Sequence, residues 1–125
     1  MAPECDEVVP VASVAEPDHG LAILDDQARL TLVGGDAALA AELLEIFCRD
    51  ILPEADSLAT RVEAKDRCAL AHKVRGAALA IGAAEIAAVA LQIEGGEAFE
   101  ADLPFAWSGA LGRLRQALAE AANRR

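Results

Sequence analysis

The chain has 125 residues, a formal charge of −10 at neutral pH and 54% hydrophobic residues, many of them alanine. This length and apolar content suit one domain with a single core, and the alanine content favours helices. The negative charge argues against a nucleic-acid-binding surface, because contacts to phosphates require clustered Lys and Arg.

The N-terminal part of the chain predicts a tail and a short helix. Residues 1–20 contain three prolines and a glycine and have no sustained helical period, so we expect a flexible tail. We expect the remaining residues, 21–125, to form one helical domain. Its first element should be a short helix from Leu21 to Leu32, which ends before Gly34 and Gly35.

The next two helices are predicted from a cap and a proline. Asp36 is a good N-cap for a helix whose apolar residues recur at three- and four-residue intervals as far as Pro53. Pro53 itself suits the first turn of a second helix, which should run to about Ala64. Short connections of this kind indicate antiparallel neighbours.

Three more helices follow, and no strand pattern is present. Asp66 is expected to cap a helix from about Arg67 to Ala80, and Gly82 should stop it. The last two helices are expected from about Ala84 to Glu94 and from about Phe105 to Ala122, and the latter presents Leu111, Leu114 and Leu118 on one stripe. The predicted fold class is therefore all-α.

The cysteines and the apolar stretches indicate the compartment. Cys5, Cys48 and Cys68 have no metal-ligand spacing, and an odd number suits reduced thiols better than a disulfide framework. No stretch approaches the roughly 20 apolar residues of a membrane span. We expect a cytoplasmic protein that binds no membrane and holds no metal.

The helix predicted over residues 67–80 presents a histidine outward. At 100° per residue its apolar residues form one stripe centred on Val74, comprising Leu70, Ala71, Val74, Ala77, Ala78 and Ile81. His72 lies about 160° from Val74, on the face that also holds Gly76 and Leu79. We therefore expect an exposed His72 opposite a buried stripe.

The surroundings of His72 favour an approach by phosphate. Five of the eleven basic residues fall within the fifteen positions from Arg61 to Arg75, so the segment is locally basic. Lys73 and Arg75 flank the histidine and are expected to attract phosphoryl oxygens. Gly76 costs roughly 0.5 to 1 kcal/mol in a helix interior, which we interpret as space left for a partner. Leu79 would offer apolar contact.

The run Ala71-His72-Lys73-Val74-Arg75-Gly76-Ala77 resembles the signature of histidine-containing phosphotransfer (HPt) domains, usually written Ala-His-x-Leu-Lys-Gly-Ser. Leu79, Gly82-Ala83 and Ile93-Glu94 extend the resemblance, which covers about residues 21 to 122. Arg75 stands where lysine is common, and Ala77 stands where serine is common.

The resemblance implies a fold and a function. The fold is an antiparallel up-and-down four-helix bundle with an extra short N-terminal helix. His72 would accept a phosphoryl group from an aspartate of a response regulator receiver domain, or of a hybrid histidine kinase, and pass it to another receiver. The receiver would supply Mg²⁺ and most of the catalysis, so the chain would be a monomeric carrier, without a cofactor of its own and not an enzyme.

Two other functions remain open. The chain could be a receiver-binding module that is never phosphorylated, because Ala77 departs from the signature and Leu79 is expected to be exposed. It could also be a purely structural helical bundle. An enzyme with its own turnover is the weakest class, because the sequence gives His72 no evident carboxylate partner and contains no ATP-binding or zinc motif.

Overall fold

The computed structural model describes residues 21–95 and 102–124, and the regular elements among them are helices without a strand. This confirms the all-α prediction. The expected tail over residues 1–20 lies outside the described residues. The elements are α3 (Asp26–Leu32), α4 (Ala37–Ile46), a π-helical turn (Phe47–Ile51), α5 (Leu52–Asp56), a 3₁₀ turn (Leu58–Thr60), α6 (Ala64–Ile81), α7 (Ala84–Glu94) and α8 (Asp102–Arg124).

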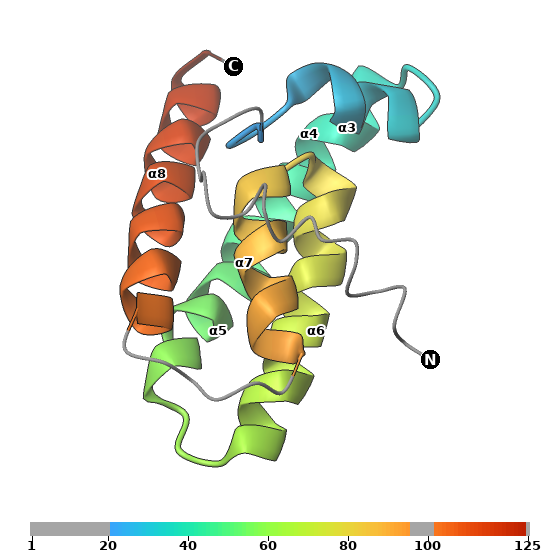
Figure 1. Ribbon diagram of the computed structural model, residues 1–125. Helices are drawn as coiled ribbons and strands as arrows, with labels where there is room; N and C mark the ends of the chain where they lie inside the picture. Colours follow the sequence, from blue (N-terminus) through green and yellow to red (C-terminus); the bar gives the residue numbers. More distant parts are fainter. Residues whose placement is uncertain (1–20, 96–101, 125) are drawn as a thin grey trace.

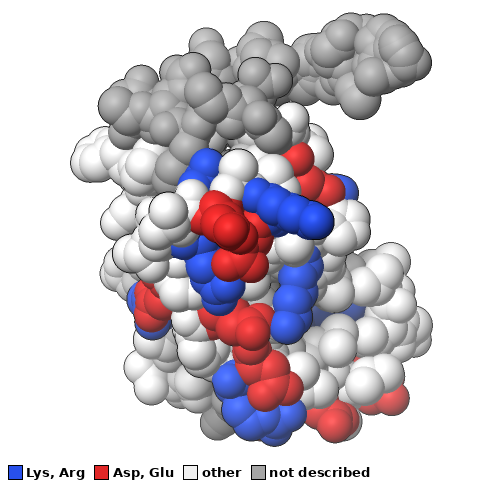
Figure 2. Space-filling model, turned by 90° about the horizontal axis from the view of Figure 1, so that it is seen from below, with Lys and Arg blue, Asp and Glu red and all other residues white. Residues whose placement is uncertain are grey.

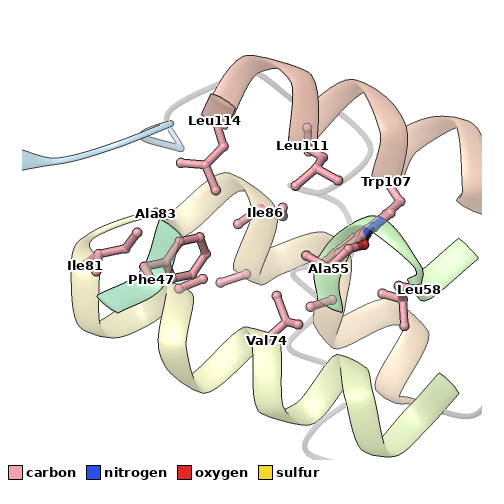
Figure 3. Close-up of a cluster of buried hydrophobic side chains, with 14 of the residues drawn as sticks. Phe47, Ala55, Leu58, Val74, Ile81, Ala83, Ile86, Trp107, Leu111 and Leu114 are labelled. Carbon is pink, nitrogen blue, oxygen red and sulfur yellow. Dashed lines mark hydrogen bonds between the residues drawn. The ribbon is translucent and has the colours of Figure 1, made fainter. Parts of the chain in front are cut away.

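The helices pack around a shared core. Figure 1 shows α6, α7 and α8 side by side, with α4 and α5 behind them and α3 across one end. The core residues come from all of the longer helices, and Trp107 and Phe47 are its two largest fully buried side chains. Figure 3 shows Phe47, Val74, Ile86 and Leu114 converging between the helices. Eight alanines lie among the buried core residues, beside larger leucine and isoleucine side chains.

The first helix is shorter than expected. It begins at Asp26 and not at Leu21, because Asp25 is its N-cap and accepts a hydrogen bond from the backbone N–H of Ala28 (2.9 Å). The residues before it are held by other backbone contacts. The carbonyl of Ala22 accepts from the N–H of Glu85, and the N–H of Asp25 donates to the carbonyl of Gly82.

Pro53 lies in the first turn of a second helix as predicted, but no break in the helical backbone precedes it. The chain runs from α4 through the π-helical turn directly into α5, where Pro53 lies in the first turn. Pro53 lacks an N–H and its ring would clash with a helical carbonyl four residues earlier, and the wider π turn accommodates both problems. Asp36 caps the beginning of this segment as predicted, since its side chain accepts from the N–H of Leu39.

The helix expected from Pro53 to Ala64 ends much earlier, at Asp56. The indole N–H of Trp107 donates to the carbonyl of Ala55 (2.9 Å), and the hydroxyls of Ser57 and Thr60 donate to backbone carbonyls three residues earlier. These side chains take up carbonyls that a longer helix would use. The predicted extension to Ala64 is therefore wrong.

The later helices agree better with the sequence. α7 has the predicted bounds, whereas α6 begins at Ala64, with Glu63 and not Asp66 at the N-cap position. Gly82 ends α6 as expected, in the left-handed conformation (φ 84°). α8 extends beyond both predicted ends, to Asp102 and Arg124, and the predicted stripe of Leu111, Leu114 and Leu118 is buried.

Candidate functional site

His72 projects from the solvent-facing side of α6. Its side chain is 68% exposed, while Leu70, Val74 and Ile81 on the opposite side of the helix are buried. The predicted stripe is confirmed except at Ala77, which is half-buried against the core. The same helical period that buries one face of α6 therefore presents the imidazole to solvent.

The imidazole of His72 contacts a carboxylate from the neighbouring helix. Its Nδ1 lies 2.5 Å from Oε2 of Glu94, the last residue of α7, and the side chain of Glu94 is only 21% exposed. A carboxylate oxygen accepts hydrogen bonds, so the contact favours the tautomer with the proton on Nδ1. Among the described residues, Nε2 has no hydrogen-bond partner. The contact thus leaves the Nε2 lone pair accessible.

Arg75 binds the same carboxylate from the other side. Its Nε donates to Oε1 of Glu94 (2.7 Å), and its Nη2 lies 3.5 Å from Oε2. Burial raises the pKa of Glu94, but the hydrogen bonds from Arg75 and His72 outweigh it, so the net pKa lies below the usual value. The hydrogen bond to Glu94 likewise raises the pKa of Arg75. Both groups of this pair are therefore charged at neutral pH.

Lys73 points to a different acid. Its Nζ lies 2.7 Å from Oε1 of Glu54 on α5, and both side chains are partly exposed. Exposed pairs of this kind contribute at most about 1 kcal/mol and rearrange readily. Lys73 is thus beside His72 in sequence but directed toward α5.

The basic segment from Arg61 to Arg75 does not form a uniformly basic face. Arg61 pairs with Asp66, and Arg67 donates to the carbonyls of Arg61 and Val62. Lys73 and Arg75 have the carboxylates described above. Figure 2, which views the end of the molecule where α6 begins and α7 ends, shows blue and red side chains lying next to one another. The folded chain therefore neutralises much of the charge that the sequence segment concentrates.

Gly76 and Leu79 leave the surface above His72 open. Gly76 is exposed, and a Cβ added there would meet no atom within 4 Å, so close helix packing does not require this glycine. Leu79 is 53% exposed on the same side of α6. Both agree with the exposure expected from the helical wheel.

Glu94 is a site residue that the sequence does not predict. In the sequence it marks the end of a helix and extends the resemblance to the HPt signature, but nothing there pairs its carboxylate with His72. A signal was available, because α6 and α7 are joined by the short Gly82-Ala83 turn. His72 and Glu94 lie at equal sequence distances before and after Ala83, and a symmetric helical hairpin brings such positions together.

The described residues contain no group of three or more His, Cys, Asp and Glu side chains that could hold a metal ion. None of the described helices has the length and apolarity needed to cross a bilayer. Neither Cys48 nor Cys68 forms a disulfide, and Sγ of Cys68 lies 3.6 Å from the carbonyl of Ile93. Comparisons with protein-family models, with curated proteins and with solved structures find no match to this chain.

Proposed function

We propose that the chain is a histidine phosphotransfer protein of a two-component phosphorelay, which carries a phosphoryl group on Nε2 of His72. The observation that supports this most directly is the contact between Nδ1 of His72 and Glu94, because it leaves Nε2 free on an exposed ring. The motif around His72 points to the same chemistry. The helices would correspond to an antiparallel up-and-down four-helix bundle, to which α3 adds a short N-terminal helix.

The transfer step would use an aspartyl phosphate on a receiver domain as donor. The Nε2 lone pair forms a bond to phosphorus while the bond from phosphorus to the aspartate oxygen breaks, and the aspartate leaves as a carboxylate. The proton stays on Nδ1, so the ring gains positive charge as the new bond forms. The carboxylate of Glu94 lies against that proton and would stabilise this charge.

The partner would supply the rest of the machinery. A receiver domain brings the acidic pocket and a Mg²⁺ ion that neutralises the transferring phosphoryl group, and its position in the relay determines whether it donates or accepts. Gly76 would leave room for its approach, and exposed Leu79 would offer apolar contact. The protein is then a reactant regenerated by its partners and not an enzyme.

The test is phosphotransfer profiling. Receiver domains encoded with this protein, including those of hybrid histidine kinases, are phosphorylated with labelled phosphate and mixed with the wild-type chain or with His72→Gln. We expect acid-labile, base-stable label on the wild type and none on His72→Gln. The chain has one other histidine, His19, so His19→Gln is the matched control and should accept label normally. If no receiver transfers label to the wild type, the carrier function is wrong.

The second candidate is a receiver-binding module that is not phosphorylated. The half-exposed Leu79 supports it, because an apolar contact can bind a partner without any chemistry at His72. Binding that survives His72→Gln, without label transfer to the wild type, would favour this module. If the wild type accepts label and Leu79→Ser no longer binds the receiver domain, the chain is a carrier that docks through Leu79.

A further inference from the structure

We propose that Arg75 is a positioning residue that acts through Glu94, holding the carboxylate so that one of its oxygens faces Nδ1 of His72. This inference rests on the proposed phosphocarrier function and deepens it. It gives Arg75 a different role from the phosphoryl contact expected from the sequence.

Two residues of α6, Arg75 and His72, each contact a different oxygen of the Glu94 carboxylate. Oε1 accepts from Nε of Arg75 at 2.7 Å, and Oε2 lies 2.5 Å from Nδ1 of His72. A carboxylate rotates easily about its terminal torsion, and Glu94 ends its helix, so few constraints of its own fix this orientation. The rigid donor geometry of the guanidinium supplies the constraint.

The charge of Arg75 has a second effect on the ring. A lone carboxylate beside a histidine favours the protonated ring, which has no free lone pair for attack. The side chain of Arg75 is 28% exposed and that of Glu94 is 21% exposed, so solvent only partly screens these two charges. The positive charge of Arg75 therefore offsets the negative charge of Glu94 at the position of the His72 ring. His72 therefore faces a hydrogen-bond acceptor whose negative charge is largely compensated.

Arg75 is also poorly placed to be a free phosphoryl ligand. Its Nε and Nη2 are both directed at Glu94, and a move toward an incoming phosphoryl group would break the contact at Oε1. Lys73 is the other cation next to His72, and it contacts Glu54. Lys73 therefore serves as the matched control, a cation on the same helix that does not bind Glu94.

The first test measures the tautomer of the unphosphorylated ring. ¹⁵N NMR at about pH 8.5, two units above the ordinary pKa of histidine, reports which ring nitrogen carries the proton. We expect Arg75→Met to shift His72 toward the tautomer protonated on Nε2, Arg75→Lys to shift it less, and Lys73→Met to leave it unchanged. An unchanged tautomer in a folded Arg75→Met protein would overturn the inference.

The second test is a double-mutant cycle on the rate of phosphotransfer. We expect Arg75→Met to slow transfer about tenfold in the wild-type background and to add little in the Glu94→Ala background. Equal slowing in both backgrounds would mean that Arg75 acts on the phosphoryl group directly, and the inference would be wrong. A tautomer shift in a protein that no receiver phosphorylates would support the role of Arg75 while refuting the carrier function.

Discussion

Nδ1 of His72 on α6 lies 2.5 Å from Oε2 of Glu94 at the end of α7, although the two residues are 22 positions apart in the chain. The contact joins the most exposed polar group of the motif to a carboxylate that is mostly shielded from solvent. This contact, two glycines and an ion pair with a buried carboxylate each lead to a testable prediction.

Glu94 should make stability depend on acid pH. Its pKa is lower in the folded chain than in the unfolded one, so its stabilising contribution is fully present above the unfolded pKa and is lost as the pH falls through the folded pKa. Urea denaturation should show Glu94→Gln about 1 kcal/mol less stable than wild type at pH 7, with the gap closing toward pH 3. Glu120→Gln, at an exposed position of α8, should show no such gap. If the stability difference between wild type and Glu94→Gln stays constant from pH 7 to pH 3, the pKa of Glu94 is not lowered by folding.

Gly76 should be dispensable for folding but necessary for the approach of a receiver domain to His72. Because an added Cβ meets nothing within 4 Å, Gly76→Ala should stabilise the protein by about 0.5 to 1 kcal/mol in thermal or urea denaturation. Gly76→Leu should also fold and yet slow phosphotransfer. Ala119→Leu, at an exposed position of α8, adds the same bulk as a control and should leave transfer unchanged. If Gly76→Leu accepts the phosphoryl group at the normal rate, Gly76 is not needed to leave space for the receiver domain.

Gly82 should be indispensable for folding. It has a φ of 84°, and an added Cβ would collide with the backbone carbonyl of Asp25. We expect Gly82→Ala to destabilise the protein by about 1 to 3 kcal/mol, measured by urea denaturation. Gly112→Ala on α8 is the control, since its added Cβ meets nothing within 4 Å and should be harmless. Equal stability of the two variants would rule out the close approach at Gly82.

The buried carboxylate of Glu85 should depend on Arg113. Nε of Arg113 lies 3.0 Å from both carboxylate oxygens, and this pair links α7 to α8. Arg113→Met leaves a buried acceptor without this partner and should cost about 1 to 3 kcal/mol in denaturation. Arg115→Met, which removes an exposed pair with Asp56, should cost less than about 1 kcal/mol. If both variants lose similar stability, the Glu85–Arg113 pair contributes no more than the exposed Arg115–Asp56 pair.

Local signals in the sequence predicted the helices best where caps and glycines punctuate the chain. α7 has the predicted ends because Gly82-Ala83 and Gly95 bound it, and Asp36 caps α4 as expected. The end of α5 depends only in part on the local hydroxyls of Ser57 and Thr60, because Trp107, far away in sequence, also takes the carbonyl of Ala55. Tertiary contacts of this kind override a helical pattern.

The candidate site was predictable only where it depends on one helix. Helical periodicity alone places His72, Gly76 and Leu79 on the exposed face of α6, and all three are exposed. The carboxylate of Glu94 comes from another helix, so it depends on the register between α6 and α7 and not on periodicity. The same register turns Arg75 from a free cation into a partner of Glu94.

The measurement that tests the central claim most directly is NMR of the protein after phosphorylation by a receiver domain. ³¹P and ¹⁵N spectra identify which atom carries the phosphoryl group. We predict a single phosphohistidine, with the phosphoryl group on Nε2 of His72 and the proton retained on Nδ1. A phosphoryl group on Nδ1, or on any residue other than His72, would contradict the role assigned to the His72–Glu94 contact.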